Sequence, residues 1–128
     1  EDAKKAIDIG CTAIIISNHG GRQLDGAPSS IKVLPEIVDA VGNKIEIHID
    51  GGIRNGQDVV KALCLGAKGT YIGRAFLYGL GALGKFGVFK TLDIIKNELD
   101  KTMAFCGRRD VKDLNRENLY KEHTFRNY

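Results

Sequence analysis

The chain has 128 residues, the size of one ordinary domain, and its hydrophobic fraction of 43% is too high for a disordered chain. Its 19 basic and 16 acidic residues leave a net charge of +3, too small and too scattered to indicate nucleic-acid binding. We expect no secretory leader, and no apolar run approaches the roughly 20 residues that span a bilayer. The three cysteines are far apart and odd in number, which favours free thiols over a metal site.

The chain opens with a helix-like segment, a strand-like segment and a second helix. Residues 1–9 place apolar side chains at helical spacing, and Gly10 is suited to end that helix. Residues 12–16 form an apolar, β-branched run without polar alternation, which predicts a strand buried on both faces. A second helix follows, and either Ser29 or Ser30 could cap its start.

The same order of helix and strand continues to the middle of the chain. The second helix is expected to end at Gly42, and residues 45–49 predict a second strand. Asn55 is suited to cap a third helix over residues 57–65, and residues 70–72 with their flanks predict a third strand. This repetition predicts an α/β fold of parallel βα units with right-handed crossovers.

The pattern changes after the third strand. Residues 75–83 are apolar and glycine-rich, which predicts a short helix and a turn. Residues 88–105 predict an amphipathic helix. Its expected inner face consists of Val88, Leu92, Ile95, Leu99 and Met103. Because no linker is present, we expect one domain over residues 1–128. Its βα repeats and closing helix would fill residues 1–107, and residues 108–128 would form a short helix and a tail.

Glycine and arginine are concentrated after the predicted strands. The chain has 16 glycines, where average usage of about 7% gives roughly nine. In parallel α/β folds, function lies at the carboxyl ends of the strands. Bare glycines and arginines beside helix starts are what a phosphate needs. The residues with this pattern are Gly51, Gly52, Arg54, Gly73 and Arg74. The alternative is a set of tight turns with surface arginines.

His19 and Arg22 follow the first strand and suggest acid–base chemistry. A histidine at a strand end can accept a proton near neutral pH, and an arginine nearby can hold a carboxylate. Together they indicate proton abstraction from an anionic substrate, although His19 alone would more often be an ordinary loop histidine. His48, inside the second strand, and Tyr71 are expected to be packing residues.

The motifs at residues 17–25, 50–56 and 72–75 together resemble the closing third of the FMN-dependent α-hydroxy-acid dehydrogenase and oxidase family. The resemblance covers nearly the whole chain, from the first helix to about Leu114. The bacterial L-lactate dehydrogenase branch is favoured by Gly26, Ser29, Ser30 and residues 76–78. It implies a (β/α)₈ TIM barrel. This chain would supply its C-terminal portion, with strands resembling six, seven and eight and the closing helices.

The resemblance also implies a cofactor and a role for each site residue. His19 would be the catalytic base and Arg22 would bind the substrate carboxylate. Ser17 would lie near the flavin. The ribityl phosphate region of FMN would be held by Asp50, Gly51, Gly52, Arg54, Gly73 and Arg74. The implied reaction is oxidation of an L-2-hydroxy acid without a metal. L-lactate, giving pyruvate, is the first candidate substrate, and glycolate and mandelate are alternatives.

Several residues that the family uses come from the first five strands of its barrel, which have no counterpart here. The chain begins at Glu1 and not at methionine, so we expect a fragment. Its expected partners are the N-terminal half of the barrel or further copies of the chain, with a quinone, a cytochrome or oxygen as electron acceptor. The alternative is a non-catalytic half-barrel from a split gene. We expect a cytoplasmic protein, or one peripheral to the inner membrane in the intact enzyme.

Another FMN or phosphosugar barrel would keep the phosphate site and use different chemistry. The motif at residues 17–25 argues against that reading, because such barrels need no histidine and arginine at this place.

Overall fold

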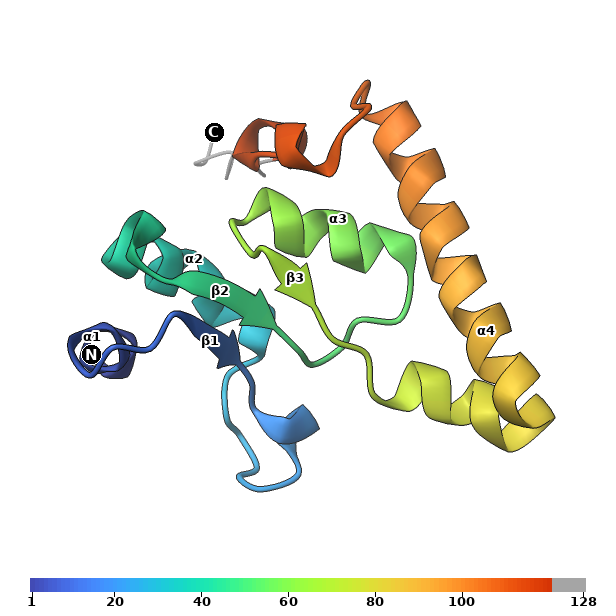
Figure 1. Ribbon diagram of the computed structural model, residues 1–128, viewed down its shortest axis with the longest axis horizontal. Coiled ribbons are helices and arrows are strands. Elements are labelled where there is room, and N and C mark those ends of the chain that lie inside the picture. The colour runs from blue at the N-terminus through green and yellow to red at the C-terminus, as the bar shows by residue number, and fades with distance from the viewer. Residues whose placement is uncertain (121–128) are drawn as a thin grey trace, which may run out of the picture.

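Three short parallel strands form the centre of the chain in a computed structural model that describes residues 1–120 (Figure 1). The strands are β1 (Ala13–Ile16), β2 (Glu46–Ile49) and β3 (Gly69–Thr70), in the spatial order β1-β2-β3. The helices are α1 (Asp2–Asp8), α2 (Ser30–Val41), α3 (Gly56–Cys64) and α4 (Arg74–Phe105). Short 3₁₀ turns lie at His19–Gly21, Gly42–Lys44, Val111–Asp113 and Arg116–Asn118. The predicted parallel βα order is confirmed, while part of the predicted tail, residues 121–128, lies outside the described residues.

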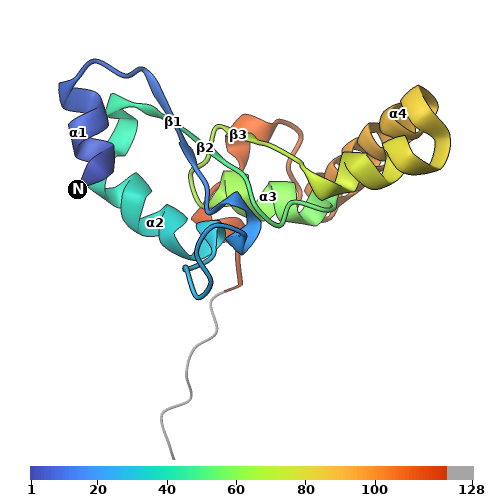
Figure 2. The same ribbon diagram turned by 90° about the horizontal axis from the view of Figure 1, so that it is seen from below.

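Helices α2 and α3 cover one face of the sheet (Figure 2), and α4 packs on α3. In the register that pairs Ile14 with Ile47 and Ile16 with Ile49, these four side chains pack with the helices in the larger core. Ile15 points to the opposite face and is 54% exposed. The prediction that the first strand is buried on both faces is therefore wrong, because residues 1–120 provide a cover for only one.

Helix ends largely follow the sequence signals. Gly10, at φ +88°, ends α1 by donating to the Ile7 carbonyl, and Asn55 caps α3 by accepting from the Asp58 N–H at 2.9 Å. Ser29 holds the N-cap position of α2, but its side chain makes no capping hydrogen bond. The third strand is also displaced: β3 is Gly69–Thr70, because pairing with β2 ends where the chain turns toward α4.

Helix α4 consists of two arms, residues 74–82 and 85–105, separated by a break at Leu83 and Gly84. Gly84 has φ +55°, so the predicted turn is confirmed, and the chain folds back there. The longer arm packs on α3 through Leu99 and Met103. Leu92, which was expected on the inner face, is 49% exposed, because the helix presents Thr91 and Ile95 to its neighbours instead.

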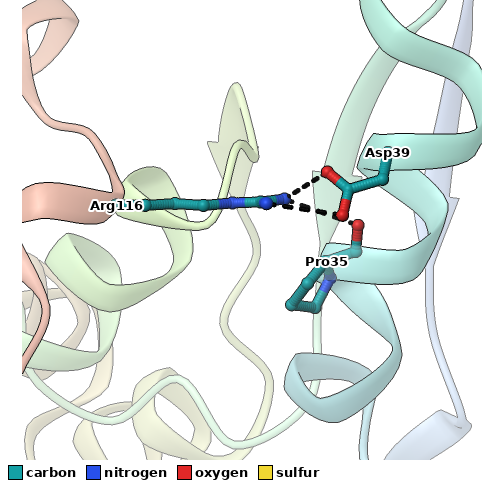
Figure 3. A network of polar contacts seen from close by, with 3 residues as sticks. All are labelled: Pro35, Asp39 and Arg116. Carbon is teal, nitrogen blue, oxygen red and sulfur yellow. Dashed lines mark hydrogen bonds and ion pairs between the residues drawn. The ribbon is translucent and has the colours of Figure 1, made fainter. Parts of the chain in front are cut away.

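The C-terminal segment returns across α3 and is joined to α2 (Figure 3). The Arg116 guanidinium lies 2.6 Å and 3.4 Å from the two carboxylate oxygens of Asp39, and it also donates to the Pro35 carbonyl at 3.5 Å. A smaller core of Val60, Cys64, Met103 and Leu114 lies beneath this segment. Among residues 1–120, no helix combines the length and apolarity required to cross a membrane.

Candidate functional site

The carboxyl ends of the three strands meet at one edge of the sheet, where they form a cleft of about 380 Å³. Ser17 does not line this cleft, but every other predicted site residue does. These residues are His19, Arg22, Asp50, Gly51, Gly52, Arg54, Gly73 and Arg74. Three arginines against one aspartate make the lining positive, which suits an anionic ligand.

His19 enters the cleft from a strained backbone position. Its φ of +52° lies in the left-handed region, which costs a side chain other than glycine about 1–3 kcal/mol. Gly20 and Gly21 continue in the same region. The turn is held because the His19 N–H donates to Ser17 Oγ at 3.1 Å and the Gly20 N–H donates to Asn18 Oδ1 at 3.0 Å. Ser17 therefore contacts the backbone of the histidine and does not face the cleft.

Asn18 is a residue that the sequence reasoning did not select. Besides accepting from the Gly20 N–H, its side chain donates from Nδ2 to the Pro28 carbonyl at 3.1 Å. It thus closes the loop that carries His19 and Arg22. An asparagine followed by a histidine and two glycines is a turn signal in the sequence, but only the structure reveals the contact with Pro28.

Arg74 connects the third strand to the histidine loop. A Cβ placed on Gly20 would lie 3.6 Å from Arg74 Nη2, so the guanidinium rests beside the turn that contains His19. Arg22 and Arg54 are exposed on the same lining. The cleft therefore has a histidine and two arginines near the first strand and another arginine at the second.

The glycines after the second strand are required by local geometry. Gly51 has φ +91°, and a Cβ there would lie only 2.8 Å from Ser30 Oγ. Gly52 has φ +82°, with open space beside it. Backbone N–H groups at these positions are therefore free of side chains, and a ligand can approach them closely. Asp50 Oδ1, beside them, is buried without a hydrogen-bond partner among residues 1–120.

The two helices that start beside the cleft differ at their N-termini. The start of α3 already has side-chain acceptors, because Asn55 accepts from the Asp58 N–H and Glu98 from the Gly56 N–H, while Asp58 accepts from the Arg54 N–H just before the helix. At α4 the N-cap is Gly73, which has no capping side chain, so the N–H groups of the first turn remain available. An anion is therefore favoured at α4, between Gly73 and the arginines.

Sequence reasoning also missed several residues that line the cleft. Tyr71 was expected to be a packing residue, but its side chain is 47% exposed and faces the cleft. Ile53, Ile72, Ala75 and Leu77 complete the lining. Apolar side chains carry no chemical signal that separates a cleft wall from a core. Among the described residues, no group of histidine, cysteine and acidic side chains has the arrangement needed for a metal ion.

Comparison with known proteins shows which family this chain resembles over most of its length. A family model described as FMN-dependent dehydrogenase matches residues 1–121. The L-lactate dehydrogenase of Caulobacter vibrioides is 53% identical over 115 residues, and the pre-mycofactocin synthase of Mycolicibacterium smegmatis is 50% identical over 119. A mandelate oxidase variant solved with a monooxide FMN adduct superimposes with a TM-score of 0.87 at 44% identity.

These matches cover most of this chain and a minority of each relative. The two curated relatives align with 90% and 93% of this chain but with only 30% of their own lengths. The mandelate oxidase structure aligns with 90% of this chain and 37% of its own. The chain therefore spans about a third of the length of the proteins it matches, and it corresponds to a portion of their TIM-barrel fold.

Proposed function

The chain belongs to the FMN-dependent dehydrogenase family, and we propose that it supplies the catalytic histidine and the FMN phosphate site of an L-2-hydroxy-acid dehydrogenase. The observation that carries this proposal is the single cleft that combines His19 and Arg22 with the arginines and bare glycines of the two following strands. L-lactate is the proposed substrate, because two of the relatives at about half identity are named for it. Glycolate and mandelate are the alternatives.

The residues of the cleft fit FMN, which is the cofactor of this family. The uncapped start of α4, with Arg54 and Arg74, suits the phosphate. The buried Asp50 Oδ1 lacks a donor within residues 1–120, and a ribityl hydroxyl is a donor of the required kind. Gly52 leaves open space for close approach, and glycine is required at Gly51 because a Cβ there would meet Ser30 Oγ.

In this mechanism, Arg22 binds the carboxylate of the hydroxy acid and orients it toward His19. His19 takes a proton from the substrate as general base, and its strained turn limits the directions in which the imidazole can point. Bound FMN would supply the acceptor for the two electrons and for the second hydrogen that the substrate loses. Arg74, beside the His19 turn, adds positive charge where the anionic substrate lies.

Flavin bleaching tests the proposal. We expect the protein, purified with FMN at its natural full length, to lose oxidised flavin absorbance when L-lactate is added without oxygen. A His19→Gln variant should keep FMN and lose the bleaching, since glutamine accepts no proton. If no short 2-hydroxy acid bleaches the wild-type protein, the proposed reaction is wrong. Glycolate and mandelate in parallel samples identify the substrate, and added quinone, cytochrome or oxygen identifies the electron acceptor.

We propose further that the 128-residue chain alone does not turn over and needs the rest of a barrel, in the same polypeptide or from a partner. The strands β1 and β3 are both edges of the sheet, and Ile15 is exposed on its uncovered face. Size-exclusion chromatography of the isolated chain should show association or aggregation. A clean monomer that oxidises L-lactate would contradict this.

A further inference from the structure

A tyrosine and a histidine from neighbouring strand segments contact each other beside the cleft. Tyr71 follows β3, and its hydroxyl oxygen lies 3.2 Å from His48 Nδ1 on β2. The two rings are also stacked, with centroids 5.6 Å apart and planes 30° from parallel. Tyr71 lines the same cleft as His19, so His48 contacts a residue of the cleft wall.

The second nitrogen of His48 faces a carboxylate. Nε2 is buried without a hydrogen-bond partner among residues 1–120, and Glu46 Oε1 lies 3.4 Å from it as a nearby charge. Glu46 and His48 are two residues apart on β2, so their side chains share one face of the sheet. On β1, the residue paired with His48 is Ile15, which brings no charge to this contact.

The strand register makes room for this arrangement. Gly69 of β3 is paired with His48, and a Cβ on Gly69 would lie 2.9 Å from Nδ1 and 3.0 Å from Cε1. A larger residue would force the imidazole away from Tyr71. The glycine therefore leaves room for the imidazole beside β3.

These contacts favour one arrangement of the protons. The negative charge of Glu46 beside Nε2 favours the tautomer with hydrogen on that nitrogen. Nδ1 is then an acceptor, and the Tyr71 O–H donates to it. With its proton held by His48, the Tyr71 oxygen keeps lone pairs that can accept a hydrogen bond from a ligand in the cleft. Second-neighbour contacts of this kind commonly set the orientation of a binding group.

We propose that Tyr71 is a ligand-binding residue that accepts a hydrogen bond from a hydroxyl of the bound molecule, and that His48 and Glu46 are positioning residues that orient its oxygen. This inference rests on the proposed function for the identity of the ligand. Two molecules in the cleft would carry such a hydroxyl: FMN through its ribityl chain, and the 2-hydroxy acid.

The test compares Tyr71→Phe with wild type in the protein at its natural full length. Phenylalanine keeps the ring and its stacking on His48 and removes only the oxygen. We expect FMN affinity, measured by flavin fluorescence, to fall by about two- to tenfold, or KM for L-lactate to rise by the same factor. This is the value of one hydrogen bond. A change in FMN affinity identifies the ribityl chain as the donor, and a change in KM identifies the hydroxy acid as the donor. Tyr120→Phe, at a 90% exposed tyrosine, is the matched control.

Glu46→Gln tests the positioning role. It should weaken the same affinity less than Tyr71→Phe does, and it should have no further effect in the Tyr71→Phe background. The ¹⁵N spectrum of His48 supplies a readout that does not need FMN, and it should show hydrogen on Nε2 in the wild type. If FMN binds but Tyr71→Phe changes neither affinity nor KM, the inference is overturned. Failure of the wild type to bind FMN would instead refute the proposed function.

Discussion

Gly79 and Gly87 bring the two arms of α4 into direct backbone contact. A Cβ on Gly87 would overlap the carbonyl group of Gly79, and a Cβ on Gly79 would overlap that of Gly87. We expect Gly87→Ala to lower the free energy of unfolding by about 1–3 kcal/mol, because neither backbone can move without opening the crossing. Urea unfolding followed by circular dichroism measures this loss.

Gly81 provides the control for this prediction. It lies in the same helix, and an added Cβ there would meet no described atom within 4 Å. Gly81→Ala should therefore raise stability by about 0.4–1 kcal/mol, since alanine is the better helix former. If both variants shift the unfolding midpoint in the same direction, the crossing does not depend on a close glycine contact.

Glu98 of α4 caps the start of α3, and this contact should be measurable. Its Oε2 accepts from the Gly56 N–H at 3.0 Å in a partly buried position. Glu98→Ala should cost about 0.5–2 kcal/mol of stability, the usual value of an N-cap contact. Glu98→Gln should cost less, because the amide oxygen still accepts. Glu36→Ala, at an exposed position of α2, should change thermal unfolding little.

The regular elements were predictable because their signals are local. The helix over residues 30–41 and the Asn55 cap follow from side chains within a few residues of each other. The exposure of Ile15 and of Leu92 was not predictable in this way. Burial of a strand face or a helix face depends on what packs against it from elsewhere, and a periodic pattern carries no information about that partner.

The cleft was predictable for a topological reason, and its supporting contacts were not. Parallel strands bring their carboxyl ends to one edge, so the residues that follow the three strands were expected on the same side of the sheet. Asn18 binds a carbonyl 10 residues away, and Tyr71 contacts a histidine 23 residues away. Such pairs depend on the loop path and the strand register, which single-residue chemistry does not reveal.

The Arg116–Asp39 pair should hold the C-terminal segment without contributing much global stability. The side chains are 43% and 63% exposed, so the pair is worth at most about 1 kcal/mol and less at high salt. Arg116→Ala should raise hydrogen exchange at residues 111–120 with little change in the unfolding midpoint. Arg109→Ala, at an exposed arginine, should leave exchange there unchanged. A large fall in the unfolding midpoint of Arg116→Ala would contradict this prediction, because it would show that the pair stabilises the whole fold.

Cys64 should be the least reactive of the thiols at Cys11, Cys64 and Cys106. Burial raises the pKa of Cys64, and the nearby Cys106 raises it further when that thiol is charged. Because the thiolate is the reactive form, a raised pKa lowers the rate at a given pH. Iodoacetamide at mildly basic pH should label exposed Cys11 first, with Cys64 reacting only as the pH rises or the protein unfolds. Mass spectrometry of the labelled peptides measures the order, and equal rates would contradict it.

Asn18 should control the chemistry of the cleft through the loop that it closes. Asn18→Ala removes the acceptor for the Gly20 N–H and the donor to the Pro28 carbonyl. The loop that holds the strained His19 should therefore lose about 1–3 kcal/mol of stabilising free energy. We expect faster hydrogen exchange over residues 19–28 and slower flavin bleaching by L-lactate, with FMN affinity little changed because the phosphate side lies on the other strands. Gln23→Ala, at an exposed position of the same loop, should change none of these. If bleaching slows equally in both variants, the effect belongs to the loop surface and Asn18 does not position the histidine.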